Sequence, residues 1–265
     1  MIVVISPSKT LDFSSEINDG YTNPEFLEET FKLIIALRKL TKIEILKLMN
    51  LSENLTILNY QRYHNFSLPF TLDNARQAIY AFKGDVYHGL AVNNFHQENI
   101  QYAQLHLRII SGLYGLLRPL DLIQAYRLEM GTKLVNQKGK DLYAYWGDTL
   151  TVKLNEVLQS EDNDILVNLA STEYFKVINK KLLQASLITP VFKEKKGDSL
   201  KVVALFAKRA RGMMASYIIK NRIKTTEDLK QFNEDGYIFN KAASNEDQLV
   251  FVRTTLTSCI NNSER

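Results

Sequence analysis

The sequence predicts an α/β or α+β fold in which a mixed β-sheet is surrounded by helices. Residues 3–5 and 165–167 are apolar at every position, as in strands that helices cover on both faces of a sheet. Longer segments with helical periodicity lie between such runs. The two kinds of segment follow one another without a regular βαβ rhythm, which favours a sheet with mixed strand directions.

Each expected strand is a short apolar run bounded by polar or turn residues, and each expected helix has a longer amphipathic pattern. No repeat, low-complexity segment or linker interrupts the chain, so we expect one domain over residues 1–265. The expected strands cover residues 2–5, 78–82, 107–110, 165–169, 187–192 and 200–206. The expected helices cover residues 24–39, 41–49, 52–63, 98–106, 142–159 and 207–221.

Residues 41–63 predict a helical hairpin. Thr41 and Glu44 have the T-x-x-E spacing of a capping box, and Ser52 is placed to cap a second helix. A helical hairpin can present backbone N–H groups and a helix N-terminus to phosphate. Hairpins that bind phosphate in this way usually contain glycine, and this one has none. The residues by themselves therefore favour a plain helical hairpin.

Composition excludes several classes of protein. The hydrophobic fraction of 45% is that of a folded globular chain. No apolar run approaches the ~20 residues of a membrane span, so no membrane partner is expected. The formal net charge is only +4, from 33 basic and 29 acidic residues, which alone predicts no nucleic-acid partner. The distribution of the charges is therefore more informative than their sum.

Cysteine and histidine usage indicates a cytoplasmic protein without a metal site. Cys259 is the one cysteine, so no internal disulfide can form, which fits a reducing compartment. We expect it to be an incidental thiol rather than a nucleophile. The four histidines show no ligand spacing, and no cofactor motif is present, so neither a metal nor a cofactor is expected.

Polar and basic residues follow several expected strands. Lys9-Thr10 is similar to the end of a Walker phosphate loop, but the required glycines are missing. Strand ends are where α/β folds build sites, so a shared cleft is the economical prediction. The alternative is that strand ends are commonly polar for no functional reason. These loops contribute Lys9, Lys83, Asp85, Asn168, Ser171 and Lys208.

Residues 111–131 combine three glycines, one proline, two arginines and two carboxylates, which is unusual for either a helix or a surface loop. Pro119 stiffens the backbone beside Arg118, so that arginine could meet an anion with less loss of freedom. A structural alternative is that Arg118 pairs with Asp121, and Arg127 with Glu129. Farther along, Arg211 lies on the polar arc expected for the helix at residues 207–221.

Together these segments resemble the YaaA family, which is associated with bacterial peroxide-stress resistance. The resemblance covers nearly the whole chain. It implies a fold unlike any common superfold, with a mixed sheet surrounded by helices. The segments that carry it are residues 5–12, 81–87, 111–131, 145–147, 168–171, 173–176, 208–212 and 232–237.

The resemblance also implies a bacterial cytoplasmic protein that helps cells to survive hydrogen peroxide and to limit iron-driven oxidation. It further implies DNA binding through a basic cleft and a helix-hairpin-helix element. The helix-hairpin-helix would correspond to residues 41–63. The cleft would contain Lys9, Lys83, Arg118, Arg127, Lys208 and Arg211.

Three hypotheses follow. The first is a DNA-binding protein of the peroxide-stress response that grips the phosphate backbone with little sequence preference. The second is an enzyme that acts on a nucleobase, a nucleotide or another anionic small molecule in the same cleft. Asp85, Glu129, Asn168 and Ser171 favour it, because phosphate binding needs no carboxylates. The third is an iron-handling protein, which the scattered histidines disfavour. No catalytic residue is assigned.

Overall fold

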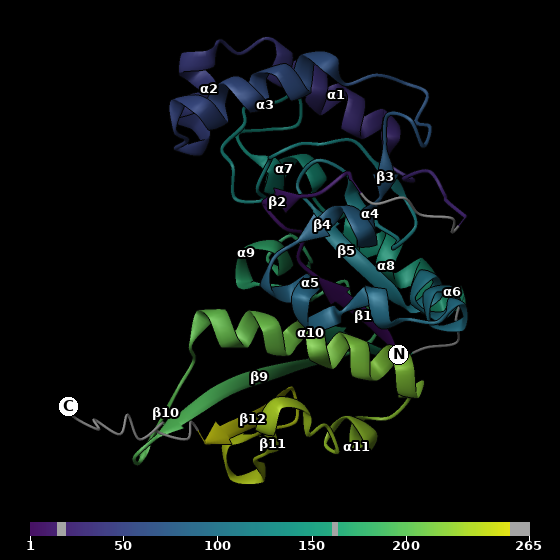
Figure 1. The fold of residues 1–265 in the computed structure, drawn as a ribbon, viewed down its shortest axis with the longest axis vertical. Coiled ribbons are helices and arrows are strands. Elements are labelled where there is room, and N and C mark those ends of the chain that lie inside the picture. Colours follow the sequence, from purple (N-terminus) through teal and green to yellow (C-terminus); the bar gives the residue numbers. More distant parts are fainter. Residues whose placement is uncertain (15–19, 161–163, 255–265) are drawn as a thin grey trace, which may run out of the picture.

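The computed structural model describes residues 1–14, 20–160 and 164–254. Its centre is an eight-stranded sheet with the strand order β11-β12-β9-β8-β1-β5-β6, and β10 pairs with β9 (Figure 1). The strands are β1 (Ile2–Ile5), β5 (Leu107–Ser111), β6 (Gly115–Leu117), β8 (Ile165–Asn168), β9 (Ser186–Lys196), β10 (Ser199–Lys201), β11 (Ile238–Phe239) and β12 (Gln248–Thr254).

The predicted mixed sheet is confirmed. Strands β8, β1 and β5 run parallel, and Val3 lies opposite both Val167 and Leu107. Strand β9 continues this parallel set and β12 adds to it. Strands β6, β10 and β11 are antiparallel to their neighbours. The carboxyl ends of β8, β1 and β5 therefore meet at one edge, which is where a site is expected.

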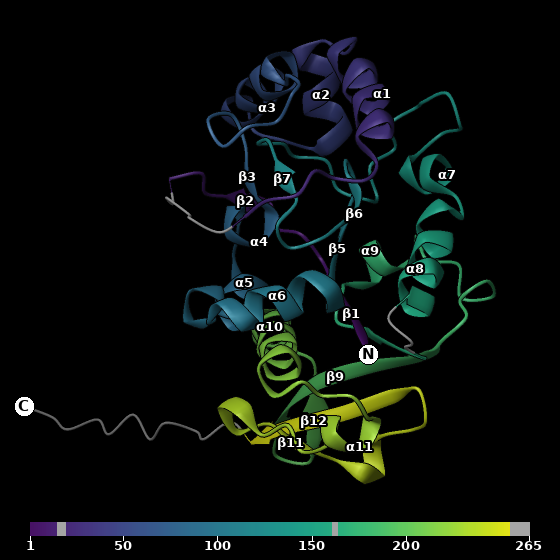
Figure 2. The same cartoon turned by 90° about the vertical axis from the view of Figure 1, so that its right-hand side faces the viewer.

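Helices cover both faces of the sheet, as predicted. Figure 2 shows α5, α6 and α10 on one face of β1 and β5, and α8 and α9 on the other. The helices are α1 (Leu27–Arg38), α2 (Lys42–Met49), α3 (Glu53–Asn65), α4 (Ala78–Ala81), α5 (Asp85–Leu90), α6 (Gln97–His106), α7 (Leu142–Trp146), α8 (Thr149–Ser160), α9 (Thr172–Phe175), α10 (Ala204–Asn221) and α11 (Thr226–Leu229).

Smaller elements complete the fold. Two short antiparallel ribbons join β2 to β4 and β3 to β7. These strands are β2 (Thr10–Leu11), β3 (Arg76–Gln77), β4 (Phe82–Lys83) and β7 (Leu122–Ile123). Turns of 3₁₀ helix lie at Val92–Asn94, Glu234–Gly236 and Lys241–Ala243.

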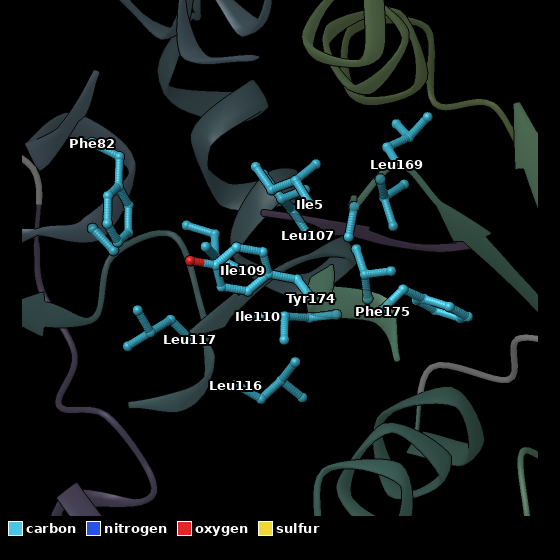
Figure 3. Close-up of a cluster of buried hydrophobic side chains, with 14 of the residues drawn as sticks. Ile5, Phe82, Leu107, Ile109, Ile110, Leu116, Leu117, Leu169, Tyr174 and Phe175 are labelled. Carbon is cyan, nitrogen blue, oxygen red and sulfur yellow. The ribbon is translucent and has the colours of Figure 1, made fainter. Parts of the chain in front are cut away.

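The core forms around the central strands because their side chains are apolar on both faces. Figure 3 shows Ile5, Leu107 and Ile109 packed with Leu169 and Phe175, and these residues are buried. Burying one such side chain stabilises a fold by roughly 1.5–3 kcal/mol. The central strands are therefore a stable base for the loops that follow them.

The strand predicted at residues 78–82 is wrong over most of its length, because α4 occupies all but the last of these residues. The backbone N–H of Ala78 donates to the carbonyl of Asp121, and that of Ile79 donates to the carbonyl of Pro119, each at 2.9 Å. These contacts with a distant segment decide the conformation. A short apolar run does not distinguish a strand from a buried helical turn.

Two other predicted elements differ from the structure. The strand predicted at residues 200–206 ends at Lys201, since only Ser199–Lys201 pair with β9, and α10 begins at Ala204. The helix predicted at residues 142–159 is divided into α7 and α8. Gly147 lies between them with φ 47° and ψ −129°, a conformation that interrupts the helix and suits glycine.

Candidate functional site

The loops after β1, β5 and β8 are connected at the carboxyl edge of the sheet. The hydroxyl of Ser6 accepts a hydrogen bond from the backbone N–H of Ser171 at 2.8 Å, which ties the end of β1 to the start of α9. Tyr87 of α5 donates to the carbonyl of Ser6 at 3.1 Å. At the end of β5, the hydroxyls of Ser111 and Tyr126 lie 2.7 Å apart. Residues from distant parts of the sequence thus form one edge.

A cluster of two cations and one carboxylate lies at this edge. Lys9 Nζ is 3.0 Å from Glu129 Oε1, and Nε and Nη2 of Arg127 are each 3.1 Å from the same oxygen. The other oxygen, Glu129 Oε2, is buried and has no hydrogen-bond partner in the part of the chain that the structure describes. The adjoining shallow recess is also lined by Pro7, Ser8, Tyr126, Leu128 and Tyr174.

The two tyrosines of the recess remain protonated near neutral pH. Burial raises the pKa of Tyr126 and of Tyr174, and the nearby charge of Glu129 raises both further. Figure 3 shows the ring of Tyr174 among the aliphatic side chains of the core. The tyrosine hydroxyls are therefore hydrogen-bond donors or acceptors here, and they are poor candidates for a general base.

The helices predicted at residues 41–49 and 52–63 are confirmed as α2 and α3. The reciprocal hydrogen bonds of a capping box join Thr41 and Glu44, and Ser52 caps α3. Asn50 makes the turn with φ 48° and ψ 57°. Asparagine is one of the few residues that adopt this left-handed conformation, so the turn forms without the glycine usual at such a position.

The helical hairpin contacts the cation cluster through α3. The hydroxyl of Tyr63 donates to the backbone carbonyl of Arg127. The neighbouring Arg62 is half-buried, and its guanidinium donates to Asn59 at 3.2 Å. Burial lowers the pKa of Arg62, and the positive charge of Arg127 lowers it further. The fold thus holds the guanidinium groups of Arg62 and Arg127 near one another. The sequence did not predict that Arg62 or Tyr63 belongs to the site.

Arg211 is half-buried, although the sequence places it on a solvent-facing arc. Burial lowers its pKa, and it makes no hydrogen bond or ion pair with another described residue. A Cβ on the adjacent Gly212 would lie 1.8 Å from the carbonyl oxygen of Val86, so the backbones of α10 and α5 are in contact. Arg211 therefore lies beside the helix whose Tyr87 bonds to the loop after β1. Lys208, on the same helix, is exposed.

Residues of the β2–β4 ribbon lie close to the same loop. Lys83 pairs with Thr10 across the ribbon, and its Nζ is 3.6 Å from Asp12 Oδ2. A Cβ on Gly84 would lie 3.0 Å from the hydroxyl oxygen of Ser8. Asp85 begins α5 and is half-buried. Lys9 precedes Thr10, and Lys83 lies opposite Thr10, so both lysines lie at the same end of the β2–β4 ribbon.

Asn168 and Ser171 have structural partners. The side-chain oxygen of Asn168 accepts from the backbone N–H of Ala170 at 3.0 Å, which shapes the loop after β8. Ser171 precedes α9 and is bonded to Ser6. Both residues lie at the carboxyl edge, where they position the loops around the cluster.

Arg118 lies apart from the other predicted cleft residues. Its Nε and Nη2 donate to Asp121 Oδ1 at 3.1 and 2.9 Å, and Nη2 also donates to the carbonyl of Asn23 at 2.9 Å. Because β6 runs antiparallel to β5, with Leu117 opposite Ile109, Arg118 is directed toward the opposite end of β5. The structural alternative stated for the sequence is therefore confirmed. Arg118 pairs with Asp121, and Arg127 pairs with Glu129.

Residues 1–14, 20–160 and 164–254 contain neither a metal-ligand cluster nor a membrane-spanning helix. No group of three or more His, Cys, Asp or Glu side chains in these ranges is placed to hold a metal ion. No helix of these ranges is both long and apolar enough to cross a membrane. Cys259 lies outside the described residues.

These features define an α/β protein with a cation-rich, tyrosine-lined site at the carboxyl edge of a parallel strand set. Residues 1–243 match the family described as peroxide stress protein YaaA, and the chain belongs to this family. A UPF0246 protein of Alteromonas mediterranea is 52% identical over 254 residues, which is 96% of this chain and 98% of the relative. A UPF0246 protein of Ralstonia nicotianae is 51% identical over 254 residues, covering 96% and 99%. Family membership supports a role in the oxidative stress response.

Proposed function

We propose that this protein acts in the peroxide-stress response by binding DNA through its phosphate backbone. The observation that carries the proposal is an excess of positive charge around one carboxylate. Lys9 and Arg127 share a single oxygen of Glu129, and Arg62 adds a second guanidinium beside Arg127. A phosphate group would supply the negative charge that the cluster lacks, and arginine suits it because the guanidinium donates in a planar fork.

The helical hairpin adds a second element suited to phosphate. The turn between α2 and α3 is anchored by the buried Leu51, and α3 begins at this turn with its N-terminal N–H groups. The contact between Tyr63 and Arg127 holds α3 against the cluster. In this proposal, residues 41–63 act as the helix-hairpin-helix that the family resemblance implies, and one nucleic-acid strand would reach both the hairpin and the cluster.

Arg211 and Lys208 extend the proposed contact surface onto α10. Arg211 has a full set of donors and no acceptor among the residues described, so an incoming phosphate oxygen would satisfy it. Every proposed contact is with phosphate rather than with a base edge. Binding is therefore expected to depend strongly on salt and weakly on duplex sequence.

A salt titration of duplex binding tests this function. Arg62→Ala and Arg211→Ala should each weaken binding to unrelated duplexes by similar factors and reduce the log–log salt slope by roughly 0.9 per lost contact. Lys230→Ala is the matched control, because Lys230 is paired with Glu227 at the end of α11. Circular dichroism first establishes that each variant is folded. If affinity and slope stay at their wild-type values in both arginine variants, these contacts are excluded.

The unpartnered oxygen of Glu129 favours a second candidate, which is a site for a nucleotide or another small anion that also carries an N–H donor. Such a ligand would satisfy Glu129 Oε2 and the surrounding cations together. Calorimetric titration with nucleoside monophosphates separates the two candidates. Binding that Glu129→Gln abolishes, with duplex affinity unchanged, would favour the small-ligand site. No heat from any monophosphate would remove this candidate.

A further inference from the structure

A groove between α1, α2 and residues 133–135 is lined mainly by apolar side chains. Its volume is about 400 Å³, within the range of small-molecule sites. Leu134 is buried, and Leu40 and Leu48 are partly buried against the core. Because the site is concave, it can remove an apolar group of a ligand from water. The apolar lining residues are Ala36, Leu40, Leu48, Leu134 and Val135.

Hydrogen bonds hold the exposed Val135 in the wall of the groove. Val135 is 75% exposed, so burial does not fix its position. The side-chain amide of Asn136 donates to the carbonyl of Leu134 at 2.8 Å and to that of Asp141 at 3.0 Å. The backbone N–H of Asn136 also donates to the carbonyl of Gly139 at 2.9 Å. This apolar wall is therefore formed before a ligand arrives, and little chain entropy is lost on binding.

The polar side chains of the groove carry an excess of positive charge. Lys47 and Lys133 line it, both are exposed, and neither has an ion-pair partner among the residues that the structure describes. Glu44 also lines the groove, but its carboxylate accepts from the backbone N–H and the hydroxyl of Thr41 at 2.7 and 2.8 Å. Two cations without partners beside an apolar surface favour a ligand that is apolar at one end and anionic at the other.

The groove is separate from the cation cluster at the carboxyl edge of the sheet. No residue of α3, and none of the proposed phosphate contacts, lines it. Figures 1 and 2 show α1 and α2 at the end of the molecule opposite β11 and β12. The groove therefore constitutes a second site with a chemistry of its own.

We infer that the groove binds a free amphiphile with one apolar chain and an anionic head group, the chemistry of a fatty acid. The chain lies along the apolar wall, and the head group lies beside Lys47 and Lys133. A lysine ammonium is a compact charge on a flexible stem, so it follows the head group without a fixed geometry. This site goes beyond the proposed function and does not depend on it.

Isothermal titration calorimetry on the full-length protein tests the inference, with each amphiphile kept below its micelle concentration. Decanoate should bind, whereas acetate, which has the head group without the chain, should give no heat. Octanoate should bind roughly 15-fold more weakly than decanoate, because each of two buried methylenes contributes about 0.8 kcal/mol. Decyltrimethylammonium, with the same chain length and a positive head, should bind more weakly than decanoate.

Four variants locate the site after circular dichroism has established that each is folded. Ala36→Phe fills the groove and should weaken decanoate binding roughly 15-fold, the effect of leaving two methylenes in water. Val135→Asp changes an exposed side chain, adds a negative charge to the wall and should also weaken decanoate binding. Lys47→Gln and Lys133→Gln should each weaken decanoate binding roughly 1.4- to 5-fold, as for exposed charge pairs, without weakening decyltrimethylammonium.

Two control variants alter exposed residues that do not line the groove. They are Val152→Phe on α8 and Lys224→Gln after α10, and both should leave decanoate affinity unchanged. Ala36→Phe should bind duplex DNA as wild type does, so failure of this inference leaves the proposed function standing. No heat from decanoate, or decanoate binding that both Ala36→Phe and Val135→Asp retain, would overturn the inference.

Three other results would overturn it and assign the groove differently. Equal affinity for decanoate and decyltrimethylammonium would show that the groove does not select an anionic head. Binding to phosphatidylserine vesicles without binding of decanoate would indicate a membrane surface as the partner. A dimer in sedimentation that Val135→Asp dissociates, without decanoate binding, would make a second copy of this chain the occupant.

Discussion

Replacing Arg118 tests whether this arginine is a structural partner or a DNA contact. Asp121 is fully buried, and Arg118 supplies two side-chain hydrogen bonds to it. Arg118→Ala leaves that carboxylate without a counter-charge, which costs 3–5 kcal/mol for a typical buried pair. Thr22 and the backbone N–H of residue 118 still donate to Asp121, at 2.6 and 2.7 Å. We therefore expect a loss of about 3 kcal/mol in the free energy of unfolding, from the low end of that range.

Urea denaturation followed by circular dichroism measures this loss, and the melting temperature should fall by roughly 6–12 °C. Burial already raises the pKa of Asp121, and removing the guanidinium raises it further. The folded variant then binds a proton more tightly than its unfolded chain, so its deficit in stability should shrink as the pH falls and grow as the pH rises. Adding Asp121→Asn should recover part of the stability, because the amide carries no charge.

The salt slope of duplex binding should be the same for folded Arg118→Ala and wild type. Two results would refute this reasoning. One is a variant whose unfolding free energy lies within about 0.5 kcal/mol of wild type, the range of an ordinary surface substitution. The other is a stable variant whose salt slope falls by roughly 0.9, which would return Arg118 to the DNA contacts.

Three further predictions concern packing, pH and redox chemistry. Gly212→Val should fail to fold or lose several kcal/mol in chemical denaturation, since any Cβ there meets the carbonyl oxygen of Val86; a near-neutral effect would contradict the close contact. Burial raises the pKa of Glu29, but hydrogen bonds, of which that from Lys138 is the strongest, lower it to about 2. The contribution of Glu29 to stability should therefore be present above about pH 4.5 and disappear toward pH 2. Lys138→Ala should weaken that acid dependence in pH-resolved melting curves. Cys259→Ser should leave peroxide survival unchanged at equal protein level, and a strong loss would indicate a thiol sensor.

Local patterns in the sequence were sufficient for much of the fold. The capping box of Thr41 and Glu44 predicts the start of α2, because its hydrogen bonds join residues three positions apart. The all-apolar runs at residues 3–5 and 165–167 are typical of strands in a sheet that is covered on both faces, and β1 and β8 confirm this prediction. The conformation of residues 78–82 could not be predicted from local patterns, because hydrogen bonds with a distant loop determine it.

The sequence by itself determined where the central strands and the helical hairpin lie, because those signals come from residues near one another in the chain, and the family, because its motifs recur along the chain. Only the tertiary structure decided which charges meet. Tyr63 reaches Arg127 across 64 positions, and Lys9 reaches Glu129 from another loop. Arg118 and Arg127 have nearly the same local setting, yet the antiparallel return of β6 sends one to the far end of β5. Side-chain chemistry is encoded residue by residue, whereas the encounter of two charges depends on strand direction and packing, which no local pattern specifies.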